Sequence, residues 1–107
     1  MNLYYIILIE WNYPTESGHE VYEYYDSLDV TKAWVKKIGD YEQDNFQETC
    51  GDIYSEASGF CMTEAKVQTI DPSKECIRDV PEYYIHSSQY PENDFWYRVR
   101  VIPVEYE

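Results

Sequence analysis

Carboxylate side chains recur at every fourth residue in the middle of the chain, and their type and spacing suit ion pairing. They are Asp40, Asp44, Glu48, Asp52 and Glu56. No lysine or arginine lies between Lys37 and Lys66. Four residues advance a helix by about 6 Å, so five carboxylates on one helix would form a negative ridge of roughly 24 Å. Such a ridge could pair with the basic groups of a partner protein.

The same ridge has a simpler interpretation as a solvated helix face. The outer face of a helix is normally charged because it faces water. Like charges at four-residue spacing, however, destabilise a helix by about 0.2–0.5 kcal/mol per pair, and interleaved lysines would remove that cost. The absence of those lysines favours a partner-binding face, with simple solvation as the alternative.

The whole chain is acidic, with 21 Asp and Glu residues against 8 Lys and Arg and a formal net charge of -13. Direct binding to nucleic acid or to an anionic membrane needs Lys and Arg, so we expect neither. The charge favours a basic protein as partner. A hydrophobic content of 44% is normal for a globular protein, so the acidity does not indicate disorder. We expect one domain, residues 1–107.

Tyrosine is frequent, with 13 residues, and several tyrosines stand next to acids. Carboxylates pair with arginine, and a tyrosine ring can stack on its guanidinium group. Alternatively, most tyrosines fill strand positions, where aromatic residues are favoured. Beyond the ridge, the predicted partner-binding residues are Glu20, Glu23, Tyr24, Asp26, Tyr41 and Glu42.

Catalytic and metal-binding patterns are weak. Residues 40–44 resemble the start of a calcium loop, but Asn45 stands where that loop needs glycine and Gly51 where it needs glutamate. The cysteines lack the paired spacing of a zinc site or a disulfide framework. They are Cys50, Cys61 and Cys76. We therefore expect no enzyme activity, no catalytic residue, no cofactor and no metal, with a small carboxylate-based enzyme as a minor alternative.

The pattern of apolar residues predicts an α+β domain in the order β-β-α-α-β-β. This is an antiparallel sheet of about four strands with one or two helices packed on one face. The expected strands are residues 3–9, 20–25, 60–70 and 95–102. Residues 3–9 are apolar throughout, which predicts a central strand buried on both faces. Pro103 is expected to limit the last strand, and the conformation of residues 71–94 stays open.

Two helices are expected between the second and third strands. The first, residues 28–38, begins at a cap on Asp26 or Ser27 and ends at Gly39. Its predicted apolar face, which should pack on Ile6, Leu8, Val99 and Val101 of the sheet, consists of Val30, Ala33, Trp34 and Ile38. The second, residues 40–57, carries the acidic ridge. Gly51 disfavours this second helix by about 1 kcal/mol relative to alanine, and a break near Cys50 and Gly51 is the alternative.

In size, charge and acid- and tyrosine-rich stretches such as residues 21–26, the chain resembles the small DNA-mimic inhibitors of phages, which include anti-CRISPR and anti-restriction proteins. The resemblance implies that the chain occupies the basic DNA- or RNA-binding groove of a host defence nuclease complex, such as a CRISPR effector or a restriction enzyme. It assigns no individual residue. An acidic protein-interaction module, such as an antitoxin or a regulatory subunit, is the alternative function. Three unpaired cysteines suit a reducing cytoplasm, which would be the bacterial host's if a phage encodes the chain. The sequence does not indicate an oligomeric state.

Overall fold

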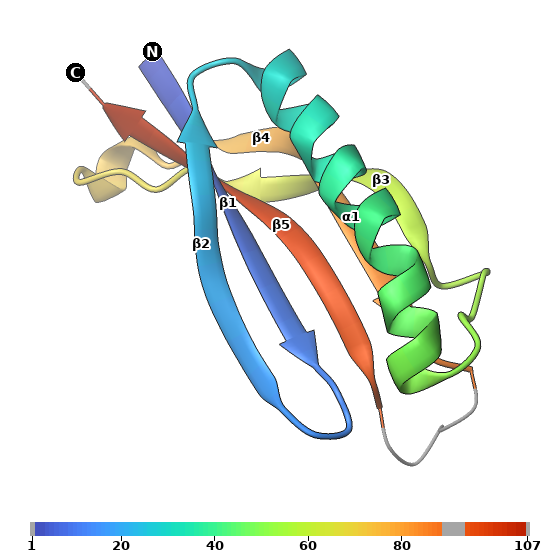
Figure 1. Cartoon of the computed structure of the whole chain (residues 1–107). Coiled ribbons are helices and arrows are strands. Elements are labelled where there is room, and N and C mark those ends of the chain that lie inside the picture. The colour runs from blue at the N-terminus through green and yellow to red at the C-terminus, as the bar shows by residue number, and fades with distance from the viewer. Residues whose placement is uncertain (1, 89–93, 107) are drawn as a thin grey trace.

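One antiparallel sheet and one α-helix make up the fold of the described residues. The structure is a computed structural model that describes residues 2–88 and 94–106. Helix α1 crosses one face of the sheet (Figure 1), in which the strands lie in the order β2-β1-β5-β4-β3. The strands are β1 (Asn2–Asn12), β2 (Ser17–Tyr25), β3 (Gly59–Lys66), β4 (Ile77–His86) and β5 (Trp96–Tyr106). The helix is α1 (Leu28–Cys50), and a 3-10 turn occupies Pro72–Lys74.

The α+β class, with a helix on one face of an antiparallel sheet, is confirmed. The expected β-β-α-α-β-β order is corrected in two respects. A fifth strand, β4, forms in the segment that the sequence left open, and one helix replaces two. Residues 89–93 of that open segment lie outside the described residues.

The hydrophobic core lies between α1 and the sheet. On β1 the odd-numbered residues Tyr5, Ile7 and Ile9 are buried, together with Val99 and Val101 of β5. The even-numbered residues of β1 from Tyr4 onward are half-buried on the other face, because side chains alternate along a strand. The prediction that β1 is buried on both faces is therefore wrong. Ile6 and Leu8 do not face the helix, whereas Val99 and Val101 do lie in the core.

The helix continues through Gly39, which was expected to end it. A Cβ atom at this position would lie 2.2 Å from Cγ of Tyr83, so glycine is needed for the close approach of the buried Tyr83 ring. The buried helix residues are Thr31, Val35, Gly39, Phe46 and Cys50. Val30 is 43% exposed and Ala33 is exposed as well, so the predicted helix face was misplaced, with only Trp34 and Ile38 partly buried against the core.

The helix ends at Cys50, where Gly51 adopts a φ of 97° and donates its backbone N–H to the Gln47 carbonyl. A positive φ is the conformation in which glycine is favoured. The predicted helix over residues 40–57 is therefore wrong beyond Cys50, and the alternative of a break at Cys50 and Gly51 is confirmed. At the other end, Ser27 is the cap, and its hydroxyl accepts a hydrogen bond from the Val30 N–H.

Two prolines lie inside strands. β4 pairs with β3 over residues 77–84 but with β5 only over residues 83–86. Pro81 lies where β4 has a ladder on one side only, which is where a missing N–H is tolerated. Pro103 is buried within β5 and does not limit it, since β5 extends to Tyr106. It also lies in a part of its strand that β4 no longer pairs with.

Candidate functional site

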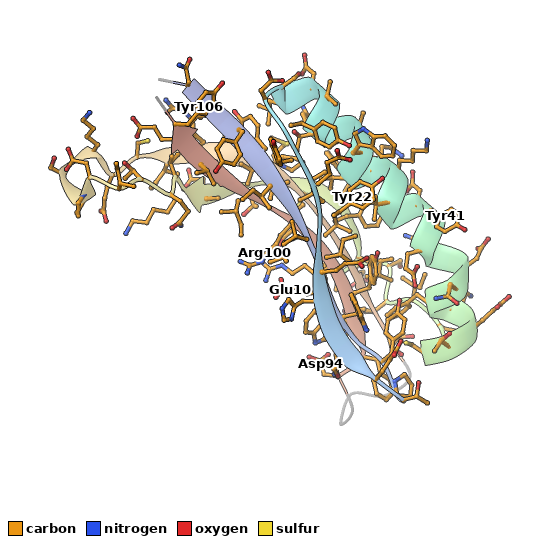
Figure 2. The ribbon with its side chains drawn as sticks, turned by 60° about the vertical axis from the view of Figure 1, so that its left-hand side comes forward. Glu10, Tyr22, Tyr41, Asp94, Arg100 and Tyr106 are labelled. Atoms are coloured by element: carbon orange, nitrogen blue, oxygen red, sulfur yellow. The ribbon has the colours of Figure 1, made fainter. Side chains whose placement is uncertain are left out.

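A groove with a cavity volume of about 350 Å³ runs between β2 and the middle of α1. It is lined by Ile9, Glu20, Tyr22, Trp34, Lys37, Ile38, Tyr41, Glu42 and Tyr97. Four elements thus contribute to it: β1, β2, α1 and β5. Tyr22 and Tyr41 project from β2 and α1 on the side of the molecule shown in Figure 2. Three of the predicted partner-binding residues, Glu20, Tyr41 and Glu42, meet here.

Aromatic rings form the wall of this groove. The Trp34 ring stacks on Tyr25, with centroids 6.3 Å apart and an interplanar angle of 9°, and also contacts Tyr22 at 5.8 Å. The Lys37 ammonium lies 4.9 Å from the centroid of the same indole. The groove therefore already holds one cation against an aromatic face, which is the interaction that an arginine of a partner would use. Tyr41 is 86% exposed at the rim.

Glu42 has a structural role within the groove. Its carboxylate accepts hydrogen bonds from the Tyr13 hydroxyl and the Asn45 amide, which ties the turn after β1 to the helix. Burial, followed by the hydrogen bond from Tyr13 to Glu42, raises the pKa of Tyr13. Burial and then the same carboxylate raise the pKa of the Cys50 thiol to about 11. Glu42 is therefore committed inside the protein rather than presented to a partner.

Asp40 is also engaged by groups of its own chain. Its carboxylate forms an ion pair with Lys36 at 2.6 Å and accepts a hydrogen bond from the Tyr83 hydroxyl at 2.7 Å. The Lys36 contact and then the Tyr83 hydrogen bond lower the pKa of Asp40. Asp40 begins the predicted ridge, but part of its charge is already neutralised.

The ridge as predicted does not form. Asp44 and Glu48 are exposed one turn apart on α1, while Asp52 and Glu56 lie beyond its end in the segment leading to β3. Glu56 accepts a hydrogen bond from the Tyr54 hydroxyl. The helix has no basic residue in its last turn. Glu48 therefore lies near the negative end of the helix dipole, where acids are disfavoured by about 0.3–1 kcal/mol.

A second acidic strip lies along β2. Glu20 and Glu23 are exposed on that strand, and Asp26 follows it directly. Residues 1–31 contain no lysine or arginine. Among residues 2–88 and 94–106, none of these three carboxylates forms an ion pair, and the same holds for Asp44 and Glu48. We call Glu20, Glu23 and Asp26 the strand strip, and Asp44 and Glu48 the helix strip.

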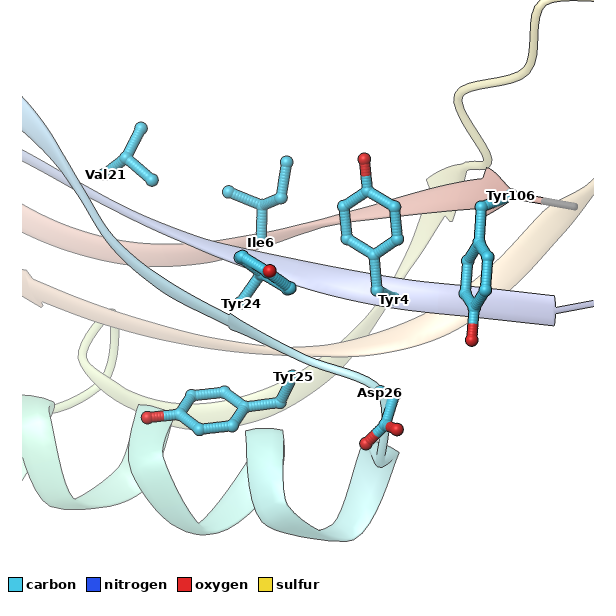
Figure 3. A pocket seen from close by; sticks show the side chains of 7 residues that line it. All are labelled: Tyr4, Ile6, Val21, Tyr24, Tyr25, Asp26 and Tyr106. Atoms are coloured by element: carbon cyan, nitrogen blue, oxygen red, sulfur yellow. The ribbon is translucent and has the colours of Figure 1, made fainter.

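The other face of the sheet carries a larger hollow of about 760 Å³ beside β2 (Figure 3). Its lining is mainly aromatic and aliphatic, consisting of Tyr4, Ile6, Val21, Tyr24, Tyr25, Asp26 and Tyr106. Tyr24, a predicted partner-binding residue, is 66% exposed, and its ring meets Tyr4 edge-on at 5.4 Å. We call this site the tyrosine hollow.

The two arginines of β5 lie on this same face. Arg100 forms an ion pair with Glu10 of β1 at 2.7 Å (Figure 2), and Arg98 forms one with Glu82 of β4. Arg98 and Arg100 are partly exposed on either side of buried Val99, so this face of β5 is in contact with solvent. Both arginines are neutralised within the sheet, so the acidic strips remain the dominant charge.

Several residues that shape the two hollows were not singled out from the sequence. Trp34 was assigned to the core, and Tyr4 and Tyr106 to no site at all. The alternation of buried and half-buried residues along β1 is invisible in a sequence whose apolar run is continuous. The lack of any cation in residues 1–31 was the available signal for the strand strip.

No metal centre is evident. No group of three or more His, Cys, Asp or Glu side chains in the described part of the chain is arranged to hold a metal ion. In the same part, no helix is long and apolar enough to cross a membrane. Comparisons with protein-family models, curated proteins and solved structures found no match.

Proposed function

We propose that this chain is a binding inhibitor that occupies a basic, nucleic-acid-binding groove of a host defence nuclease complex, in the manner of phage DNA mimics. The observation that supports it is the presence of two exposed carboxylate strips, one on β2 and one on α1, the two elements that contribute most residues to the aromatic groove. Neither strip has a cationic partner among the described residues. Glu20 of the strand strip lies in the groove beside Tyr22 and Trp34, and the exposed helix strip follows on α1 after the last groove residue, Glu42.

The carboxylates and the aromatic rings contribute to partner binding in different ways in this proposal. Each exposed ion pair with a partner contributes only about 0.2–1 kcal/mol. Together, carboxylates from both strips would steer association and make it strongly dependent on salt. Tyr22, Trp34 and Tyr41 supply contact area with few side-chain torsions to immobilise. Arg-rich channels that bind phosphates and bases offer the guanidinium groups that both kinds of side chain recognise.

A second candidate is an acidic interaction module whose partner does not bind nucleic acid, such as a toxin or an enzyme that it regulates. The tyrosine hollow favours this candidate, because an apolar hollow of about 760 Å³ has no obvious counterpart in a groove built for phosphates. The two functions differ in one measurable property, namely whether partner binding excludes DNA or RNA.

The experiment captures partners from a bacterial lysate on the immobilised protein, elutes them with salt and identifies them by mass. The captured partner is then titrated with fluorescent duplex DNA or RNA and with this protein. Displacement of the nucleic acid at equimolar protein, which weakens steeply as salt rises, supports the mimic. A partner that binds nucleic acid and this protein simultaneously would contradict it and favour the interaction module.

A further inference from the structure

The outer edge of β2 is open. β2 lies at one end of the strand order and is hydrogen-bonded to β1, and no other described strand pairs with it. It is nine residues long, and nearly all of its side chains are exposed. An exposed edge of this kind presents a row of unpaired backbone N–H and C=O groups, to which a strand of another chain can be added.

The two faces of this edge strand differ in chemistry. Glu20 is paired with Ile9, and both point to the helix side of the sheet, as Glu23 does opposite Ile7. Val21 is paired with Leu8 and Tyr24 with Ile6, so these two residues lie on the opposite, uncovered face. β2 therefore carries its two glutamates on the helix side, beside Tyr22 and Tyr25, and the apolar contacts of Val21 and Tyr24 on the other side.

The tyrosine hollow adjoins this edge. Its lining includes both Tyr24 and Tyr25, which lie on opposite faces of β2, so the hollow reaches the strand itself (Figure 3). Tyr4 packs against Tyr24 at 5.4 Å and against Tyr106 at 5.7 Å. These mutual contacts hold the rings in place before anything binds. Asp26 adds a carboxylate at the end of the strand.

We propose that β2 accepts a short extended segment of the partner as an additional strand of the sheet. Arginine or lysine side chains of that segment face Glu20 and Glu23, and its alternate apolar side chains cover the tyrosine hollow. The inference rests on the proposed function in taking the partner to be basic. A second copy of the chain does not suit the edge, because like charges placed opposite each other across strands are destabilising.

A β-bulge limits the length of the added strand. The register of β1 and β2 shifts between Ile7 and Leu8, which leaves Tyr22 without a partner on β1. Bulges increase the local twist and interrupt regular pairing along an edge. A few residues of partner strand are therefore what this edge can take, with Val21 and Tyr24 supplying the apolar contact on either side of the bulge.

The probe is a short fluorescent peptide of alternating arginine and valine, titrated with the intact protein while anisotropy is recorded. Two control peptides separate charge from strand pairing. One replaces arginine with glutamate, and the other keeps every side chain but carries N-methyl groups on alternate backbone nitrogens. We expect both controls to bind at least about tenfold more weakly. Hydrogen exchange of the β2 amides should slow only when the unmodified arginine–valine peptide is added.

Variants locate the site. Val21→Asn removes an apolar contact at a position that is 66% exposed, so the fold should tolerate it. We expect it to weaken binding of the arginine–valine peptide several-fold. The matched change Ile77→Asn, at a position of β4 that is 58% exposed and outside both proposed sites, should leave that affinity unchanged. Equal binding of the N-methylated peptide would overturn strand addition in favour of simple charge attraction. A dimer of the free protein that Val21→Asn abolishes would also overturn it, because the occupant would then be a second copy.

The strand-addition proposal and the proposed inhibitor function can be refuted independently of each other. If the peptide does not bind but the protein still displaces nucleic acid from its captured partner, strand addition is wrong and the proposed function stands. If the peptide binds at β2 and no nucleic acid is displaced, the inhibitor function is wrong and the edge remains a docking site.

Discussion

Gly39→Ala should destabilise the protein, although an alanine inside a helix normally stabilises it by about 1 kcal/mol relative to glycine. The new Cβ would lie 2.2–2.4 Å from three ring atoms of Tyr83, near the root of a buried side chain. Overpacking of this kind costs about 1–3 kcal/mol. Moving the ring also disturbs its hydroxyl, which donates to Asp40 and accepts from the Gln43 amide.

Each of those hydrogen bonds contributes about 0.5–1.5 kcal/mol. After the helix-propensity gain is subtracted, the free energy of unfolding should fall by about 1–5 kcal/mol. Even the lower value lowers Tm by at least ~4 °C. Urea unfolding followed by circular dichroism measures this change. In a Tyr83→Ala background the three ring atoms that the new Cβ would meet, Cγ, Cδ1 and Cδ2, are gone, so the same alanine should be neutral or stabilising. If Gly39→Ala stabilised the parent protein, the close approach of Tyr83 to the helix would be refuted.

Asp40→Asn should lower the free energy of unfolding at neutral pH. Lys36 and Tyr83 lower the pKa of Asp40 below its ordinary value of 3.8. The charged carboxylate therefore stabilises the folded state above pH 3.8, and this stabilisation is lost as the pH falls through the lowered pKa. The urea midpoints of parent and variant should converge as the pH falls. Cys50 is buried, and burial raises the pKa of its thiol to about 11. Iodoacetamide at pH ~8 should therefore label the exposed Cys61 well before Cys50, which should react only on unfolding. Early labelling of Cys50 would show that the end of the helix opens readily. Phe46→Ala should cost about 3–5 kcal/mol and Trp34→Ala less, because Phe46 is 0% exposed and Trp34 lies partly in the groove; the reverse order in urea unfolding would show that the helix packs on a different face.

Local signals predicted much of the fold. Ser27 is an N-cap, and the cap fixed the start of α1. The apolar run of β1 and the alternation of Arg98 and Arg100 with valine in β5 each marked a strand. Asp71 caps the 3-10 turn that begins at Pro72, and such a cap followed by proline is also a local signal. These features depend on residues that are close together in the chain, so they could be predicted from the sequence.

The remaining features depend on contacts between distant segments. Gly39 looks like a helix stop unless one knows that the Tyr83 ring lies against it. Pro81 argues against a strand unless one knows that β5 pairs with only the last residues of β4. The acidic ridge had the right helical spacing at Asp44 and Glu48, but Gly51 ended the helix before its last two members.

The candidate site illustrates the same limit. Glu42 and Asp40 matched the pattern of exposed acids, yet Tyr13 and Tyr83 bring their hydroxyl groups to these carboxylates from elsewhere in the chain. The strand strip kept its predicted exposure because β2 is an edge strand with little packed against it. Its proximity to the groove on one side and the tyrosine hollow on the other could only come from the register of β1 and β2.

The central claim is that the two acidic strips compete with nucleic acid for a basic groove, and paired charge variants test it most directly. Three variants each remove two exposed carboxylates: Glu20→Gln with Glu23→Gln, Asp44→Asn with Glu48→Gln, and, as the matched control, Glu64→Gln with Asp79→Asn on the opposite edge of the sheet.

The measurement is the concentration of each variant that displaces labelled DNA or RNA from the captured partner, over a range of salt concentrations. We predict that both strip variants need several-fold more protein at low salt and lose sensitivity to salt, while the control behaves like the parent. Identical displacement curves for all three variants and the parent would show that the strips only solvate the protein, and the claim would be contradicted.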